Sequence, residues 1–348
     1  MPTLSIHDRA VGSPHSAFLI AEVSQNHEGS LGMAHAYIEA AAQAGADAIK
    51  FQTHIAAAES TRDEPFRIQF SRQDATRYAY WKRMEFSPEQ WAGLASHARE
   101  KGLVFLSSPF SVAAVRLLQQ LGVKAWKVGS GEVRSPDLLR AILEAGGPIL
   151  LSTGMSSWAD IDSNVQHLQA SGAEVALFQC TSKYPTPLEQ VGLNVLSEMR
   201  ERYDVPVGLS DHSGTPFPAL AALARGCDLL ELHVTFDRRL FGPDVSASVT
   251  FEEFQLIRAA RDSFERMDRH PVDKDAIAQD LGPLRAMFGK SLALVSDLRA
   301  GERLSSQHLT LKKPATGIPP DRMIEVLGRR LARDVSSERL LAWEDLVP

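Results

Sequence analysis

Eight short apolar segments recur along the first two thirds of the chain, separated by amphipathic stretches of helical length. The segments are FLIAEV (18–23), AIKFQT (48–53), VFLSSP (104–109), AWKVGS (125–130), ILLSTG (149–154), VALFQC (175–180), VPVGLSD (205–211) and LLELHVT (229–235). Such runs are typical of parallel strands buried on both faces, which need helical crossovers between them. Eight strand–helix units predict an α/β fold of the (β/α)8 TIM-barrel type, and a doubly wound open sheet is the alternative.

Glycines precede six of these segments by a few residues, where the preceding helix is expected to end. They are Gly45, Gly102, Gly122, Gly147, Gly172 and Gly226. A glycine at this position ends a helix in the left-handed conformation before the chain turns into a strand. The pattern therefore supports alternation of helices and strands.

Two connections are too long for the regular spacing. Residues 54–103 are too many for one helix, and residues 59–87 are expected to form an excursion before a helix at 88–101. Residues 236–250 form a second long loop before a helix at 251–268. Long loops after barrel strands are usually lids or binding loops, so both are expected over one face of the barrel.

A polar, breaker-rich stretch separates this region from the C-terminal part of the chain. We predict a TIM-barrel catalytic domain at 1–267, a linker at 268–284 and a small mixed domain at 285–348. The last part contains the β-like pieces SLALVS and LTLKKP.

Composition narrows the class of protein. The net charge of −6 and the dispersed basic residues argue against a nucleic-acid partner. Cys180 and Cys227 lie inside apolar runs and are expected to be reduced core thiols. Neither a secretory leader nor an apolar run of ~18 residues is visible, so we expect a cytoplasmic protein without a membrane span.

Polar and charged residues gather where the predicted strands end, which is where barrel enzymes place their chemistry. They are Glu22, Asn26 and His27; Lys50 and Gln52; Ser107 and Ser108; Lys127, Ser130 and Glu132; Ser152 and Thr153; Gln179 and Thr181; Ser210, Asp211 and His212; and Glu231 and His233. Strand ends meet solvent and some polarity is ordinary. Lysines, histidines and acids inside apolar runs are more than solvent exposure of strand ends explains. They predict a site at which side chains from several strands meet.

Two pairs of residues suggest specific chemistry. His212 and His233 follow adjacent strands, so their imidazoles can hold a divalent transition metal with open positions, or each can hydrogen-bond substrate or Asp211. Lys50 and Lys127, with nearby hydroxyls, suit a phosphate or a phosphorylated carboxylate. The alternative is that one lysine is a Schiff-base nucleophile.

With these residues in view, the chain resembles the sialic acid (N-acetylneuraminate) synthase family. The resemblance is carried by IAEVSQNHEGSLGMA, AGADAIKFQTH, LSSPFS, KVGSGE, LSTGM, CTSKYPTP, GLSDHS and ELHVTFDRRLFGPD, in order and spacing. The segment FGKSLALVSDLRAGERLSSQHLTLKKPATGIPP is similar to that family's antifreeze-like (SAF) domain.

The resemblance implies condensation of phosphoenolpyruvate with an open-chain N-acylated hexosamine and water, giving a nonulosonic acid and phosphate. It implies Mn²⁺ or Mg²⁺ held by His212 and His233, with Glu22 close to the reacting carbons and Glu22 or Glu132 moving protons. It further implies a phosphoenolpyruvate site made by Lys50, Ser108, Lys127, Ser130, Ser152, Ser182 and Ser210, and a sugar site made by Gln52, Glu132, Tyr184, Asp244 and Lys313.

Three departures from the family pattern concern the substrates. Ser108 stands where many members have threonine, which keeps the hydroxyl, and Ser182 stands where some relatives have asparagine. Lys313 stands where many members carry an arginine that reaches the N-acyl group, and lysine lacks the bidentate fork. A legionaminic- or pseudaminic-type product therefore remains open beside a neuraminic one.

The resemblance also implies a homodimer in which the small domain of each chain covers the partner's barrel. A lid folded back within one chain is the alternative to this arrangement. A carbohydrate-binding protein without catalysis is a further reading, although it gives no reason for the ring of ionisable groups.

Overall fold

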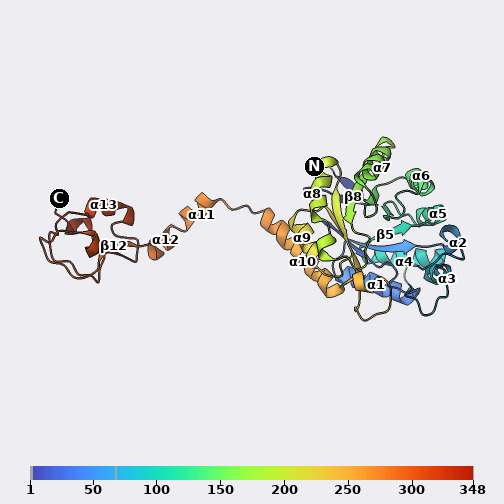
Figure 1. Ribbon diagram of the computed structural model, residues 1–348, viewed down its shortest axis with the longest axis horizontal. Helices are drawn as coiled ribbons and strands as arrows, with labels where there is room; N and C mark the ends of the chain where they lie inside the picture. Colours follow the sequence, from blue (N-terminus) through green and yellow to red (C-terminus); the bar gives the residue numbers. More distant parts are fainter. Residues whose placement is uncertain (1–2, 67–68, 348) are drawn as a thin grey trace. The chain divides into compact units, whose positions relative to one another are not determined.

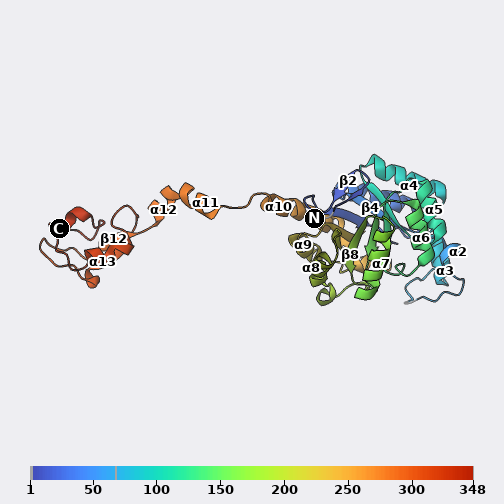
Figure 2. The same ribbon diagram turned by 90° about the horizontal axis from the view of Figure 1, so that it is seen from above.

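The computed structural model describes residues 3–66 and 69–347, which fall into two compact units at Met1–Arg269 and His270–Pro348. In the first unit, parallel strands gather inside a layer of helices (Figures 1 and 2). The barrel strands are β3 (Phe18–Glu22), β4 (Ala48–Thr53), β5 (Val104–Pro109), β6 (Trp126–Val128), β7 (Ile149–Ser152), β8 (Val175–Cys180), β9 (Val207–Asp211) and β10 (Leu229–Thr235).

The pairing order closes these strands into a barrel. Hydrogen-bonded neighbours run β5–β4–β3–β10–β9–β8–β7–β6, and the two ends of this path, β5 and β6, lie next to each other. The predicted TIM-barrel fold is thus confirmed, and the open-sheet alternative is wrong because the sheet curves back on itself.

Helices cover the outside of the barrel with their apolar faces turned toward the strands. They are α1 (Leu31–Gln43), α4 (Pro88–Glu100), α5 (Val112–Gln120), α6 (Pro136–Ala145), α7 (Trp158–Ala170), α8 (Leu193–Arg202), α9 (Phe217–Ala224) and α10 (Phe251–Asp268). Residues such as Tyr37, Trp91 and Phe254 form one continuous core with the outward-facing strand residues. The six predicted glycines all have positive φ, so the helices end as expected.

A second, smaller core fills the barrel interior toward the amino ends of the strands. The hairpin of β1 (Leu4–Ile6) and β2 (Arg9–Val11) contributes Leu4, Ile6 and Val11, which pack with Phe18 and Leu229. This end of the barrel is therefore filled by apolar side chains, leaving the carboxyl ends for polar groups.

The two predicted long loops contain short elements. The first holds α2 (Ala56–Glu59) and α3 (Arg77–Met84), and the second holds β11 (Val249–Thr250), which pairs with the end of β10. Arg83 on α3 bonds the backbone carbonyl and carboxylate of Glu28 and the carboxylate of Asp74. The loop after β4 is thus tied to the loop after β3.

The second unit has its own core. It contains α11 (Lys274–Asp280), α12 (Gly282–Phe288), β12 (Ser291–Leu294), β13 (Leu309–Lys312) and α13 (Met323–Val326). β12 and β13 pair antiparallel, and their leucines pack against Ile318, Val326 and Leu341. The predicted linker at 268–284 contains α11 and the start of α12. Asp273 caps α11 by accepting bonds from the amides of Asp275 and Ala276.

Candidate functional site

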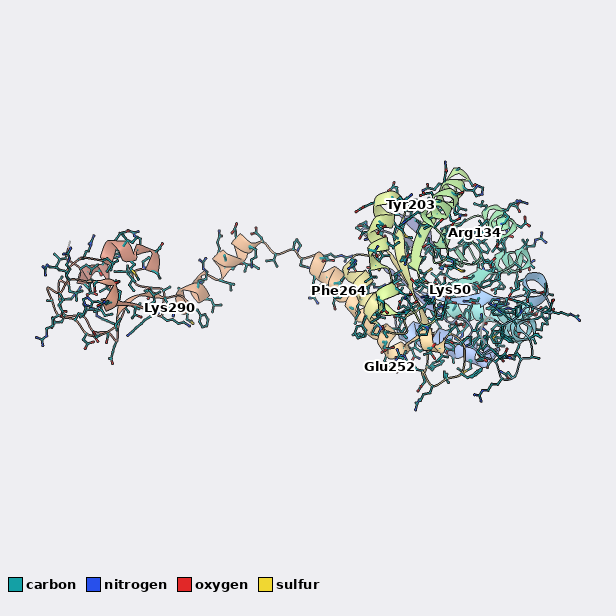
Figure 3. The ribbon with its side chains drawn as sticks, in the orientation of Figure 1. Lys50, Arg134, Tyr203, Glu252, Phe264 and Lys290 are labelled. Atoms are coloured by element: carbon teal, nitrogen blue, oxygen red, sulfur yellow. The ribbon has the colours of Figure 1, made fainter. Side chains whose placement is uncertain are left out.

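Buried ionisable residues meet where β10, β3 and β4 lie side by side. The strand register pairs His233 with Glu22 and Glu22 with Lys50, so the three residues stand at one level of the barrel. Lys50 lies on β4 among the barrel strands (Figure 3). Lys127 on β6 and Glu231 on β10 complete this charged cluster, and each member is buried.

The two lysines and two glutamates interact directly. Lys50 Nζ lies 2.5 Å from Glu22 Oε2 and 3.9 Å from Glu231 Oε2. Lys127 Nζ lies 3.5 Å from Glu231 Oε1. Glu231 therefore stands between the two ammonium groups, while Glu22 faces Lys50.

The surroundings move the pKa values of these groups in different directions. Burial raises the pKa of Glu22 to about 7, against the opposing charge of Lys50. Burial also acts to raise the pKa of Glu231, but Lys127 and Lys50 outweigh it and bring that pKa to about 2. Burial lowers the pKa of Lys127. One glutamate thus titrates near neutral pH while its neighbour stays ionised.

Serine hydroxyls line the charged cluster. Lys50 donates to Ser108 Oγ at 3.1 Å, and Ser210 Oγ donates to Glu231 Oε1 at 3.1 Å. Lys127 donates to Ser152 Oγ. The predicted lysine and serine residues are thus brought together.

Ser130 and Ser182 belong to a neighbouring wall of small groups. Ser130 Oγ accepts from the amide of Gly154 at 3.1 Å and lies 3.2 Å from Cys180 Sγ. A Cβ on Gly154 would come within 2.7 Å of both Cys180 Sγ and Ser182 Oγ. A larger residue at this position would displace these side-chain atoms, so Gly154 leaves room for the hydroxyls of Ser130 and Ser182 beside it.

His212 and His233 also meet, as their adjacent strands predict. Their ring centroids lie 4.9 Å apart. Tyr184 bonds His212 Nε2 through its hydroxyl at 3.1 Å, while His212 Nδ1 lies 3.2 Å from the carbonyl of Thr181. Burial lowers the pKa of each histidine to about 3, so both rings are neutral at physiological pH.

The two rings fit a divalent cation with open positions. Neutral imidazoles are the form that binds metal, and the carbonyl of Thr181 fixes the His212 proton on Nδ1. His212 Nε2, which the Tyr184 hydroxyl bonds in this structure, is then the nitrogen whose lone pair would coordinate a cation in place of that hydroxyl. His233 Nδ1 is buried without a hydrogen-bond partner in the described part of the chain. Within residues 3–66 and 69–347, no third histidine, cysteine or acid joins them to form a larger ligand group.

Gln52 and Asp244 form a hydrogen-bonded edge next to Glu22. Gln52 Nε2 donates to Glu22 Oε1 at 3.3 Å and to Ser24 Oγ at 3.1 Å. Ser24 Oγ donates to Asp244 Oδ2 at 2.5 Å. Two of the predicted sugar residues are therefore joined through Ser24, for which sequence analysis gave no role.

Glu132 stands somewhat apart from this edge. It accepts from Ser135 Oγ at 2.9 Å and lines a cavity of about 320 Å³. Phe110 and Ser111, which follow β5, line the same cavity. In the second unit, Lys313 follows β13, and its ammonium lies 5.0 Å from the ring centroid of Phe288.

Three residues that sequence analysis left without a role support the site. Glu231 bridges the lysines, and its spacing of two residues from His233 on one strand was a usable signal. His54 Nε2 lies 3.2 Å from Gln52 Oε1. The His54 ring stacks on Trp81 and Phe110, with ring centroids 4.0 and 4.4 Å apart, respectively. No local pattern indicates His54 or Ser24, since Trp81 and Phe110, which stack on His54, and Asp244, which bonds Ser24, are distant in the chain.

Comparisons with known proteins identify this barrel. The model described as "NeuB family" matches residues 37–270, and the SAF domain model matches residues 289–347. The chain belongs to the NeuB family. The resemblance found in the sequence is therefore confirmed, including its C-terminal domain.

Several relatives of this NeuB family chain are named as synthases. N,N'-diacetyllegionaminic acid synthase of Campylobacter jejuni is 30% identical over 93% of this chain and 98% of its own. Human N-acetylneuraminate-9-phosphate synthase is 32% identical over 97% of this chain and 95% of its own. A sialic acid synthetase of Leptospira borgpetersenii aligns with a TM-score of 0.71 at 27% identity, covering 82% of this chain and 96% of that structure.

Among the helices of residues 3–66 and 69–347, none is long and apolar enough to cross a bilayer.

Proposed function

We propose that this protein condenses phosphoenolpyruvate with the open-chain form of an N-acylated hexosamine and water. The products are a nine-carbon 2-keto sugar acid of the sialic type and phosphate. The observation that carries the proposal is the pair of buried lysines, Lys50 and Lys127, on either side of Glu231 and beside serine hydroxyls. The names of the NeuB family relatives, which are synthases of such acids, support it.

The phosphoenolpyruvate site consists of the two lysines of the charged cluster and the serines beside them. Its residues are Lys50, Ser108, Lys127, Ser130, Ser152, Ser182 and Ser210. With both lysines and both glutamates ionised, the cluster has no net charge. A pKa near 7 lets Glu22 take up a proton when the anion arrives, which leaves the cluster with one net positive charge. The lysines then stabilise the phosphate and carboxylate throughout the reaction.

Glu22 is the residue best suited to move protons. A general acid–base group works best when its pKa lies near the working pH, and burial gives Glu22 a pKa of about 7. The enol carbon bonds to the aldehyde carbon, water adds to the carbon that carries phosphate, and loss of phosphate gives the keto group. Glu132 is the alternative proton carrier.

His212 and His233 would hold a divalent cation, Mn²⁺ or Mg²⁺. Such a cation would supply Lewis-acid polarisation of the sugar aldehyde. The histidines contribute neutral donors, and Tyr184 lies beside both rings. Gln52, Asp244 and Glu132 would receive the sugar hydroxyls, because each presents hydrogen-bonding groups near the carboxyl ends of the strands.

A lid from the C-terminal domain completes the proposal. The chemistry benefits from exclusion of bulk water, which a lid provides. As the resemblance to the sialic acid synthase family implies, we place Lys313 at the N-acyl end of the sugar, supplied by the partner chain of a homodimer. Mixing a Lys313→Ala chain with a His212→Ala chain tests this. In a mixed dimer with shared sites, one site carries both lesions and the other neither, so activity returns in part. No recovery despite confirmed subunit exchange favours a lid within one chain.

One observation favours a second chemistry on the same barrel. Burial lowers the pKa of Lys127, and a lysine with a lowered pKa is the form that attacks carbonyl groups. A Schiff-base aldolase would therefore use Lys127. Borohydride treatment in the presence of pyruvate distinguishes the two reactions, since only the aldolase leaves a covalent adduct on the lysine.

The decisive experiment measures phosphate release and the product mass together. Phosphoenolpyruvate is supplied with N-acetylmannosamine or with a 6-deoxy diacetamido hexosamine, with and without EDTA. We expect sugar-dependent phosphate release, a nine-carbon keto acid and loss of turnover on chelation. Activity with one sugar and not the other assigns the product as neuraminic-type or legionaminic/pseudaminic-type. Full turnover in EDTA would contradict the metal assignment.

A further inference from the structure

Ser24 has an unusual backbone conformation for its place in the molecule. Its φ is 50°, in the left-handed region, and only His7 and Glu28 share a positive φ among the non-glycine residues described. His7 occupies the exposed turn of the N-terminal hairpin, whereas Ser24 is 1% exposed at the end of β3. Glycine adopts this conformation without strain, so a serine here needs a compensating role for its side chain.

The polar atoms of Ser24 join three parts of the site. Its hydroxyl donates to Asp244 Oδ2 at 2.5 Å, in the loop after β10, and accepts from Gln52 Nε2 at 3.1 Å, on β4. Its backbone amide donates to Glu22 Oε1 at 3.1 Å. One residue therefore links the acid at the reaction centre to the sugar-facing edge.

These bonds fix the direction in which the Gln52 amide points. Gln52 Oε1 accepts from Gln25 Nε2 at 2.9 Å and faces His54 Nε2 at 3.2 Å. Gln52 Nε2 is left to donate to Ser24 and Glu22. Ser24 Oγ already donates its proton to Asp244 and can only accept from Gln52, and Glu22 Oε1 is a second acceptor on the same side. A flipped amide would therefore place its carbonyl oxygen against two acceptors.

Asp244 depends on the same hydroxyl. The carboxylate accepts from Ser24 Oγ and, at 3.4 Å, from the amide of Gln25. Burial raises the pKa of Asp244 and the Ser24 bond opposes that change. Without the hydroxyl, Asp244 loses its shortest hydrogen bond, which is one of the contacts that tie the loop after β10 to the end of β3, beside the bond from Asn26 Nδ2 to Ser248 Oγ at 2.9 Å.

We propose that Ser24 is a positioning residue whose hydroxyl holds Asp244 and Gln52 in the arrangement that receives the sugar. That the ligand is a sugar rests on the proposed function. The arrangement of Ser24, Asp244 and Gln52 rests only on the hydrogen bonds described above. It places the determinant of sugar affinity in a side chain that need not touch the sugar itself.

Two substitutions separate the hydroxyl from the backbone strain. Ser24→Gly and Ser24→Ala both remove the hydroxyl and keep the amide that bonds Glu22, but only glycine relieves the left-handed strain. We expect the KM for the sugar to rise about tenfold in both variants, because each loses one hydrogen bond to a charged group. The KM for phosphoenolpyruvate and kcat should stay within about twofold, since the lysines and Glu22 are intact.

Stability should separate the same two variants. Ser24→Gly is expected to have a higher urea midpoint of unfolding than Ser24→Ala, because glycine relieves the left-handed strain. The KM for the sugar should be the same in the two variants. Ser16→Ala is the matched control, because Ser16 Oγ donates to Glu265 Oε2 at 2.6 Å; it removes a serine–carboxylate bond remote from the site and should leave both KM values unchanged. A wild-type sugar KM in both Ser24 variants would overturn the proposal. So would a sugar KM that rises in Ser24→Ala and not in Ser24→Gly.

Hydrogen exchange makes this test independent of the reaction. Amides of the loop at 236–250 should exchange faster in Ser24→Ala than in the wild-type protein and the Ser16→Ala control. If the wild-type chain releases no phosphate, the proposed function fails, but the exchange rates still decide whether the Ser24 hydroxyl holds this loop. Unchanged exchange in the loop would contradict that role.

Discussion

The two ends of the barrel both bury charged residues, but they satisfy them differently. At the amino end, Asp47 accepts from Arg9 at 2.5 Å, from Arg261 at 2.6 Å and from the amide of Leu19 at 2.8 Å. Arg261 also donates to the carbonyl of Ala17. Both carboxylate oxygens are thus fully engaged, which is how a buried ion pair avoids a net penalty.

At the carboxyl end, several buried polar atoms lack such partners. Glu231 Oε2, Asp211 Oδ1 and His233 Nδ1 have no hydrogen-bond partner within the described residues. Leaving buried polar atoms unpaired costs free energy. The hydrogen-bonding groups of Glu231, Asp211 and His233 are thus less completely paired than those of Asp47 at the amino end. The contrast indicates that the amino end serves stability and that the carboxyl end is kept ready for ligands.

The largest effect is expected from the paired histidines. His212→Ala or His233→Ala should lower turnover by at least about 10³-fold, because Lewis-acid polarisation is worth several kcal/mol. Metal analysis of dialysed protein should show a parallel loss of bound Mn²⁺. The exposed His167 gives a control variant, His167→Ala, with normal turnover and metal content.

Normal metal content in both site variants would remove the histidines from the metal site. Loss of activity accompanied by a lower urea midpoint would point to a folding defect instead, so unfolding is measured alongside.

The next effect concerns the buried lysine. Lys127→Ala should lower kcat/KM for phosphoenolpyruvate by roughly 10²- to 10³-fold, the usual cost of removing one preorganised charge from an active site. Both KM and kcat should change, since the charge faces the anion in the ground state and the transition state. Lys124→Ala, an exposed lysine three residues earlier, should behave as the wild type. Wild-type kinetics in Lys127→Ala would exclude it from the site.

Much of the scaffold was predictable because periodicity and glycine placement are local signals. Five strands, including β4 (Ala48–Thr53) and β10 (Leu229–Thr235), and helix α10 fall at or within one residue of their predicted bounds. The pairing of His212 with His233 followed from strand order alone, because neighbouring strands in a barrel end at the same face. Strand β6 is shorter than predicted, since Gly129 begins a turn.

The details of the site were not predictable from local patterns. The left-handed backbone of Ser24 and the stacking of His54 depend on loops after β4 and β10 that are distant in the chain. The hairpin of β1 and β2 was missed because three-residue strands carry too little periodicity. The partners of Glu231, Lys50 and Lys127, are distant in the chain and come near it only in the folded barrel.

A moderate effect on stability, without an effect on chemistry, should follow from Asp47→Ala. Removing one partner of a buried ion pair typically costs about 3–5 kcal/mol, and Asp47→Ala leaves the buried Arg261 with the more exposed carboxylate of Asp262 as its counter-charge. Urea unfolding measures this loss, and kcat per folded molecule should remain normal. Asp204→Ala, at an exposed position, should stay within about 0.5 kcal/mol of the wild type. Reduced kcat in folded Asp47→Ala would contradict the division of roles between the barrel ends.

The smallest effect extends the comparison to the second unit, where Asp345 repeats the satisfied arrangement of Asp47. Its carboxylate accepts from Arg339 at 2.6 and 2.8 Å and from the amide of Ala342 at 2.9 Å, and Arg333 lies 2.9 Å away. The Arg339 hydrogen bonds lower the pKa of Asp345. Its stabilising contribution is therefore present above the unfolded-state pKa of about 3.9 and is lost as the pH falls through the lower folded-state pKa.

Asp345→Asn in the full chain should accordingly cost about 1–2 kcal/mol at neutral pH, since the arginines are partly exposed and screened. The difference from the wild type should shrink below pH ~4, where the wild-type carboxyl also loses its charge. Hydrogen exchange of β12 and β13 reports this unit specifically, and Asp321→Asn at an exposed position is the control. A difference that stays constant from neutral pH to well below pH ~4 would show that packing, and not the charge of Asp345, stabilises this unit.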